Sequence, residues 1–169
     1  MRPVSQGIEL HRDAIRTYLA RAGSLPDSAW ITPRAPGKWS PAELTQHLIL
    51  TYEALVAELS GGPGIRVRVK GWRLLTLRLF VMPRFLKHGI VPPGVRAPKE
   101  TAPAAGDPDR GAGLARLQEA SRTFEDLARG GEGRRGSTVT HPFFGRLSLA
   151  QGVRFAEVHV RHHTGQLPS

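Results

Sequence analysis

The clearest helix signal in this chain is the stretch Trp39-Ser40-Pro41-Ala42-Glu43-Leu44-Thr45-Gln46-His47-Leu48. Ser40 is a favourable N-cap, and Pro41 stands at the first helical position, where its missing N–H costs nothing. Glu43 follows Ser40 by three residues and completes a capping box. We therefore expect a helix from Pro41 to about Leu59, ended by the glycine- and proline-rich residues 61–64.

Four further segments have helical spacing of their apolar residues. They are 7–22, 71–87 with a break or bend near Pro83, 108–129, and 149–165, the last opened by a capping box of Ser148 and Gln151. Residues 65–70 alternate apolar and basic side chains, and we favour a lead-in to the next helix over a short strand. Residues 24–38, 89–108 and 130–136 are expected loops, and 141–147 an expected turn.

Five helical segments without a convincing strand predict an all-α fold. We expect a four-helix bundle with an inserted basic helical segment between the second and third bundle helices. The length of 169 residues suits one domain spanning 1–169. There is no cysteine, which excludes disulfides and thiolate metal sites. No secretory signal is visible, and the longest apolar stretch, 74–82, is interrupted by Arg78, so we expect a cytoplasmic protein without a transmembrane segment.

The positive charge is concentrated in one part of the chain. The formal net charge is +10, and no acidic residue occurs between Glu58 and Glu100. The basic residues of that segment are Arg66, Arg68, Lys70, Arg73, Arg78, Arg84, Lys87, Arg96 and Lys99. Such a segment is compatible with a solvated face, an anionic substrate, a nucleic acid or a membrane surface. Because no nucleic-acid-binding motif occurs, we expect no specific nucleic acid partner.

Three histidines are the candidate metal ligands. His159 and His163 are four residues apart, so both imidazoles lie on one helix face and can reach one ion. His162 competes with His163 for that place, although it is expected to point outward. His47 lies on the apolar side of 41–59; it is either an ordinary core residue or the third ligand from a facing helix. Three imidazoles suit a divalent ion, zinc or nickel first, and leave one coordination position open.

The motifs resemble the DinB-like family. The stretch 39–48 is similar to the start of that family's second helix, and His141-Pro142-x-Phe144-Gly145-x-Leu147-Ser148 with His159-x-x-x-His163-x-x-Gln166-Leu167 is similar to its last helix. The likeness is closest to a branch of unknown function. It implies an up-down-down-up bundle, a divalent metal on His47, His159 and His163, and frequent homodimers. Better-understood relatives resemble transferases that activate a low-molecular-weight thiol at the metal.

Two main classes of function therefore stay open, beside a less favoured third, a nucleic-acid binder that would use the basic segment. One is a metal-dependent enzyme, either a thiol transferase or a hydrolase, acting on a small thiol or an anionic small molecule. The other is a non-enzymatic, metal-stabilised protein of the stress response or of partner binding. Candidate residues that assist the site are His141, Glu157 and Gln166. Glu43, Tyr52 and His11 are weaker candidates, since a cap or ordinary packing explains each of them.

Overall fold

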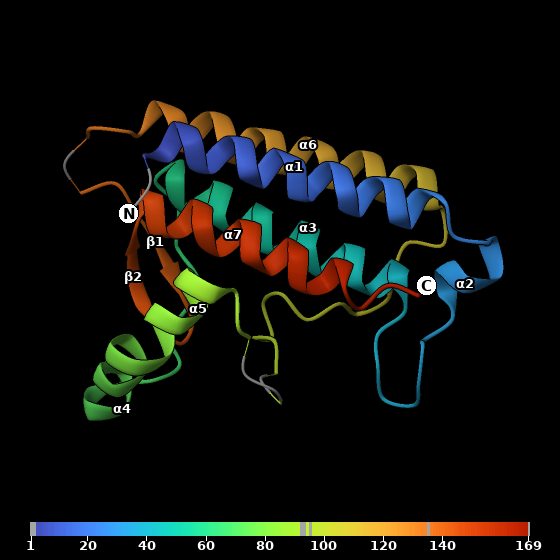
Figure 1. Ribbon diagram of the computed structural model, residues 1–169, viewed down its shortest axis with the longest axis horizontal. Coiled ribbons are helices and arrows are strands. Elements are labelled where there is room, and N and C mark those ends of the chain that lie inside the picture. Colours follow the sequence, from blue (N-terminus) through green and yellow to red (C-terminus); the bar gives the residue numbers. More distant parts are fainter. Residues whose placement is uncertain (1–2, 92–93, 95, 135, 169) are drawn as a thin grey trace.

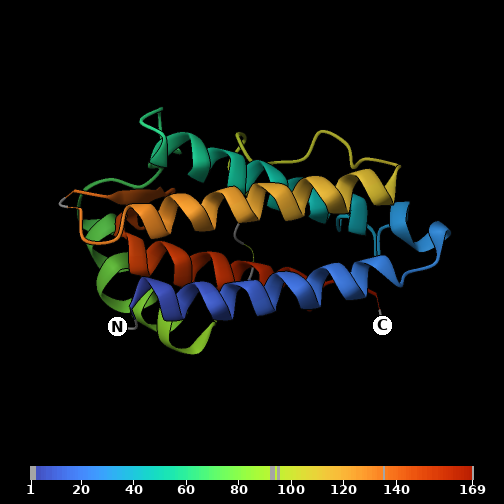
Figure 2. The ribbon, with the colours of Figure 1, turned by 90° about the horizontal axis from the view of Figure 1, so that it is seen from above.

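The long helices form a bundle, in which His47 and the pair His159/His163 come to lie on facing helices. The computed structural model describes residues 3–91, 94, 96–134 and 136–168. The four longest helices of these ranges are α1 (Val4–Gly23), α3 (Pro41–Leu59), α6 (Arg110–Gly130) and α7 (Leu149–Thr164). α1 packs on α6 and α7, and α3 packs on α6 (Figure 1). Seen from above, the four helices lie roughly alongside one another (Figure 2).

Both expected capping boxes are present. The Ser40 N–H donates to Glu43 Oε2 at 2.7 Å, and the Glu43 N–H donates to Ser40 Oγ at 3.2 Å. Ser148 and Gln151 exchange the same pair of bonds at 3.0 and 3.3 Å. These bonds satisfy backbone donors that a helix start otherwise leaves unpaired. The cap role of Glu43 is therefore confirmed.

Apolar residues at helical spacing fill the space between the helices. Ile8 and Tyr18 of α1, Leu48 of α3, Phe124 of α6 and Val160 of α7 are completely buried. Because each of these helices has one apolar side and one polar side, the apolar sides can only be buried together, as in other helix bundles.

The inserted basic segment is helical, although its helix is irregular. α4 (Gly71–Thr76), the π-helical turn η1 (Leu77–Val81) and α5 (Met82–His88) follow one another without a gap. The irregularity expected near Pro83 is the wide turn of η1, just before the residue whose missing N–H interrupts the α-helical pattern. Residues 63–70 have neither helical nor strand structure, as expected for a lead-in.

Two elements correct the sequence-based expectations. A short helix, α2 (Asp27–Ile31), lies within the expected loop 24–38, where Trp30 is buried and donates from Nε1 to the Asp107 carbonyl at 2.8 Å. The expected turn 141–147 is part of a hairpin of β1 (Thr138–His141) and β2 (Gly145–Ser148), so the fold is mostly rather than purely helical. Strands of four residues are too short for their alternating pattern to stand out from a loop.

The hairpin closes on Gly145, which has a φ of +68°, a conformation that glycine adopts at little cost.

None of the helices within the described ranges has the length and apolar character needed to cross a membrane.

Candidate metal centre

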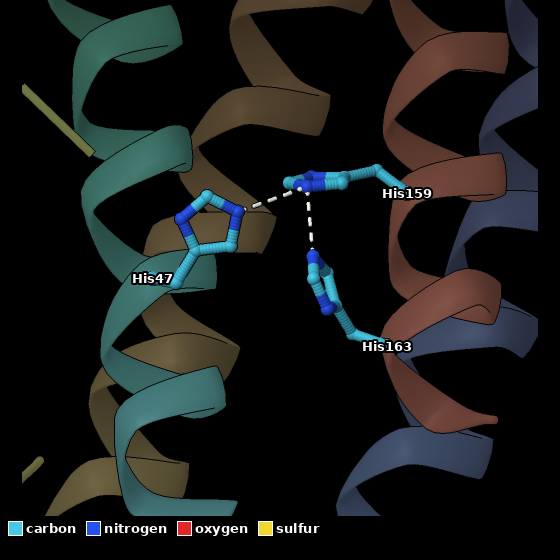
Figure 3. Close-up of side chains that lie close together, drawn as sticks. All are labelled: His47, His159 and His163. Carbon is cyan, nitrogen blue, oxygen red and sulfur yellow. Dashed lines mark hydrogen bonds between the residues drawn. The ribbon is translucent and has the colours of Figure 1, made fainter. Parts of the chain in front are cut away.

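Three imidazoles meet between α3 and α7. His47 projects from the middle of α3, and His159 and His163 project from successive turns of α7 (Figure 3). His159 Nε2 lies 3.1 Å from His47 Nε2 and 3.0 Å from His163 Nε2. One ring nitrogen from each of the three lies within 4.8 Å of the others, a grouping that could hold a metal ion.

The outer nitrogens of two rings are held by carbonyl oxygens. His47 Nδ1–H donates to the Thr101 carbonyl at 2.6 Å, and His163 Nδ1–H donates to Gln166 Oε1 at 2.7 Å. A carbonyl oxygen can only accept, so both rings carry their proton on Nδ1 when neutral. Their Nε2 lone pairs therefore point toward the shared centre, the arrangement in which histidine binds metals.

With these protonation states, the neutral cluster has fewer N–H donors than it has close nitrogen–nitrogen contacts. If His159 Nε2 carries a proton, it can donate it to His47 or to His163, but not to both. At least one pair of nitrogens about 3 Å apart then faces lone pair to lone pair. A cation between the rings would accept all three lone pairs. Two nitrogens bound tetrahedrally to zinc are about 3.3 Å apart, so the separations of His159 Nε2 from the other two nitrogens, 3.1 and 3.0 Å, require only a small adjustment.

Burial keeps the three rings neutral. Desolvation lowers the pKa of His159 and His163 well below the usual range, and the neighbouring imidazoles lower both further. Desolvation also lowers the pKa of His47, although its bond to the Thr101 carbonyl acts in the opposite direction. Because only a neutral imidazole can ligate a metal, the environment favours the binding form.

Aromatic rings border the centre. Phe155, one turn before His159 on α7, stacks on the His159 ring with centroids 5.3 Å apart. The Trp39 ring lies 4.9 Å from the His47 ring. His159 itself is partly exposed, whereas His47 and His163 are buried. Two aromatic rings therefore border the cluster, and His159 is its most exposed member.

His141 lies close to the centre without joining it. It ends β1, its ring stacks on Phe144 with centroids 4.4 Å apart, and Phe155 contacts it edge-on. Its Nδ1 accepts from the N–H groups of Phe143 and Phe144, both at 3.2 Å. Desolvation lowers the pKa of His141 to about 3. Phe155 thus has His141 and His159 as neighbours.

The other candidates, on α7 or just after its end, have two kinds of partner. Gln166 bonds directly to a histidine of the cluster, and its Nε2 also donates to His162 Nε2 at 2.9 Å. His162 is thereby engaged with Gln166 and is not one of the three converging rings. Glu157 is buried between Arg154 and Arg161, with contacts of 2.7 and 3.1 Å. Its carboxylate thus forms ion pairs with two arginines of the same helix.

His11 and Tyr52 form a second buried network. The Tyr52 hydroxyl bonds to His11 Nε2 at 2.6 Å, and His11 Nδ1 bonds to Glu125 Oε1 at 2.7 Å. Arg12 Nε completes the chain by donating to Glu125 Oε2 at 2.7 Å. This network joins α1, α3 and α6 and shares no hydrogen bond with the three converging histidines.

Three residues beside the centre were not anticipated as part of it. The Thr101 carbonyl leaves no sequence signal, because every residue carries the same group, although connections as long as 89–108 often have a function. Phe155 could have been found, since a residue four before His159 shares its helix face. Trp39 stands next to the cap of α3, and the sequence gives it no role beyond that motif.

Two cavities lie away from the cluster. One of about 300 Å³ lies between the ends of α3 and α6 and the hairpin, lined by Glu58, Asp126 and Thr138 among others. The other, of about 400 Å³, lies between α5 and α7 and is lined by His88 and His162 among others. His47, His159 and His163 line neither of them.

Comparison with known proteins confirms the family. The family model described as the DinB superfamily matches residues 10–167. Searches of curated proteins and of solved structures returned no match. The matched range includes α3 with His47 and α7 with His159 and His163. Because the match covers almost the whole length and contains the converging histidines, the chain belongs to the DinB superfamily.

Proposed function

We propose that this chain is a metal-dependent enzyme of the DinB type, in which the Nε2 atoms of His47, His159 and His163 hold one divalent ion, zinc or nickel. The observation that carries the proposal is the convergence of three Nε2 atoms whose rings are held from behind by carbonyl oxygens. The proposal includes a single-domain, up-down-down-up bundle. In its support, α1 and α7 run in one direction and α3 and α6 in the other (Figure 1).

The proposed reaction joins a low-molecular-weight thiol to an electrophile. The thiol gives up its proton and its sulfur forms a bond to an electrophilic carbon, which loses its leaving group or, in an epoxide, breaks its bond to the ring oxygen. A bound divalent ion with an open coordination position lowers the pKa of a thiol or water molecule and so supplies a nucleophile near neutral pH. The converging group of described residues contains no fourth histidine or carboxylate, which supports an open position. Thr101 and Gln166 orient the rings, and Phe155 and Trp39 limit the access of water.

A second candidate is a non-enzymatic, metal-stabilised protein. It is favoured by one observation, that His47 and His163 are buried, so that an ion between them would have little contact with solvent. A structural ion would act by holding α3 to α7, because binding to the folded chain alone stabilises that chain by mass action.

Elemental analysis tests the site itself. Purified protein should carry close to one zinc or nickel ion per chain, and His47→Ala or His163→Ala should release it. His162→Ala is the matched control, because His162 neighbours His163 in sequence but bonds to Gln166. Loss of the ion from the His162 variant, with retention in the His163 variant, would contradict the assigned ligands.

Cobalt substitution separates the two candidates. If the open position accepts a thiol, adding a small thiol to the cobalt protein should produce a sulfur-to-metal charge-transfer band. A cobalt spectrum that does not respond to thiols, together with a fourth protein ligand on the ion, would mean a structural metal.

A further inference from the structure

The basic helical segment exposes an apolar stripe. Trp72, Leu75, Leu79 and Phe80 are 72%, 57%, 58% and 60% exposed, respectively. Their spacing of three, four and one places them along one side of α4 and η1. These two elements stand at one end of the molecule, away from the four long helices (Figure 1). We call these four residues the exposed stripe. Large apolar side chains grouped in this way mark interaction surfaces.

The opposite side of the segment is firmly attached to the protein. Arg78 Nη1 donates to the carbonyls of Phe144 and Arg146, both at 3.0 Å. Phe85 of α5 is buried, with its ring 5.8 Å from Phe144 and 6.0 Å from Phe155. The segment therefore already buries one apolar side in the fold, and the exposed stripe is a second one.

Positive charge surrounds the exposed stripe. Lys70, two residues before Trp72, and Arg73, directly after it, are exposed. The Arg73 guanidinium lies 5.6 Å from the Trp72 ring. Arg84 and Lys87, on the following turns, are also exposed. No acidic residue occurs between Glu58 and Glu100, and Glu100 itself pairs with Arg68. Apolar side chains bordered by uncompensated cations are the composition of helices that lie in the surface of an anionic membrane.

We propose that the exposed stripe binds the surface of an anionic lipid bilayer, with Trp72, Leu75, Leu79 and Phe80 entering the interface and the basic residues contacting lipid headgroups. Two of the four side chains are leucines, which gain by leaving water but offer a nucleic acid neither stacking nor hydrogen bonding. A two-fold contact between copies would place one positively charged surface against another. An anionic membrane surface can bind both the apolar side chains and the basic residues of the segment.

Vesicle flotation tests the proposal. The protein should float with vesicles of phosphatidylcholine and phosphatidylglycerol at low ionic strength and should not float with phosphatidylcholine alone. High salt should weaken the binding, because it screens the attraction of the basic residues. Tryptophan fluorescence should shift to the blue on binding. Trp72→Phe should abolish most of that shift, since Trp30 is already buried and Trp39 packs against His47 outside the exposed stripe.

Paired variants separate the two contributions. Leu75→Glu with Leu79→Glu should weaken binding by at least about tenfold, and so should Lys70→Glu with Arg73→Glu. The matched controls are Ile31→Glu, at an exposed apolar residue of α2, and Arg122→Glu, at an exposed residue of α6; neither should change binding. An unchanged melting temperature shows that each variant remains folded.

Three outcomes would overturn the proposal. The first is no flotation with anionic vesicles at low ionic strength. The second is binding that the control variants weaken as much as the stripe variants, which would mean a general attraction of a cationic protein. The third is evidence that the exposed stripe binds another partner. Such evidence would be a dimer that the leucine variants dissociate, or tighter binding of the protein to an oligonucleotide than to vesicles.

Discussion

Gln166 Oε1 accepts a hydrogen bond of 2.7 Å from His163 Nδ1, which directs His163 Nε2 at the two other imidazoles. This contact links a residue just beyond the end of α7 to the proposed ion. Because hydrogen bonds to the outer nitrogen set both the tautomer and the orientation of a histidine ligand, Gln166 should influence metal affinity without touching the metal.

Removing the Gln166 acceptor should weaken metal binding. Gln166→Leu should lower the affinity for zinc by about 10- to 100-fold, measured by competition with a chromophoric chelator. Gln166→Glu is the matched control, because a carboxylate oxygen still accepts from His163 Nδ1. Equal affinity in Gln166→Leu and the unaltered protein would show that the bond does not orient His163.

Removing the metal should lower thermal stability. A ligand present at about 100 times its dissociation constant adds about 2.7 kcal/mol to the free energy of unfolding. Chelator should therefore lower the melting temperature at neutral pH, followed by circular dichroism. The His47→Ala protein should melt at one temperature with or without chelator. A chelator-insensitive melting temperature for the unaltered protein would mean that the cluster holds no ion in solution.

The metal-free protein should lose stability in acid. Burial lowers the pKa of His141 to about 3 in the folded chain, whereas an unfolded histidine titrates near 6.5. Between about pH 6.5 and about pH 3 the unfolded chain binds a proton that the folded chain does not, so the free energy of unfolding falls as the pH falls. His47, His159 and His163, whose pKa values are also lowered, act in the same direction.

Urea unfolding at several pH values measures this dependence. Each such histidine contributes a slope of up to about 1.4 kcal/mol per pH unit. His141→Phe removes one titrating group, so its slope should be smaller by about that amount, whatever its stability at neutral pH. An unchanged slope in the variant would show that His141 is not held neutral by the fold.

The second buried network should matter for stability but not for the metal. Tyr52→Phe leaves His11 Nε2 without its partner in the core, which should cost about 1–3 kcal/mol in urea unfolding and leave the metal content unchanged. Tyr18→Phe is the control. It removes the bond to Thr45, but Thr45 Oγ1 still donates to the Pro41 carbonyl at 2.9 Å, so its cost should be smaller. Equal costs would contradict this assignment.

The sequence by itself determined the parts of the fold that depend on neighbouring residues. The capping boxes at Ser40 and Ser148 were predictable because each is completed within three residues. The pairing of His159 and His163 was predictable because helical geometry places residues four apart on one face. The apolar spacing of the long helices likewise depends only on the period of the helix.

Only the tertiary structure decided which distant groups meet. It places His47 opposite His159, brings the Thr101 carbonyl to His47 Nδ1, and pairs four-residue strands around Gly145. It also determines that the inserted segment buries Phe85 of α5 and leaves Trp72 of α4 and Leu79 of η1 exposed. The physical reason is common to all of these. The sequence does not distinguish one backbone carbonyl, one short strand or one apolar side of a helix from others of the same kind. They differ only in what packs against them.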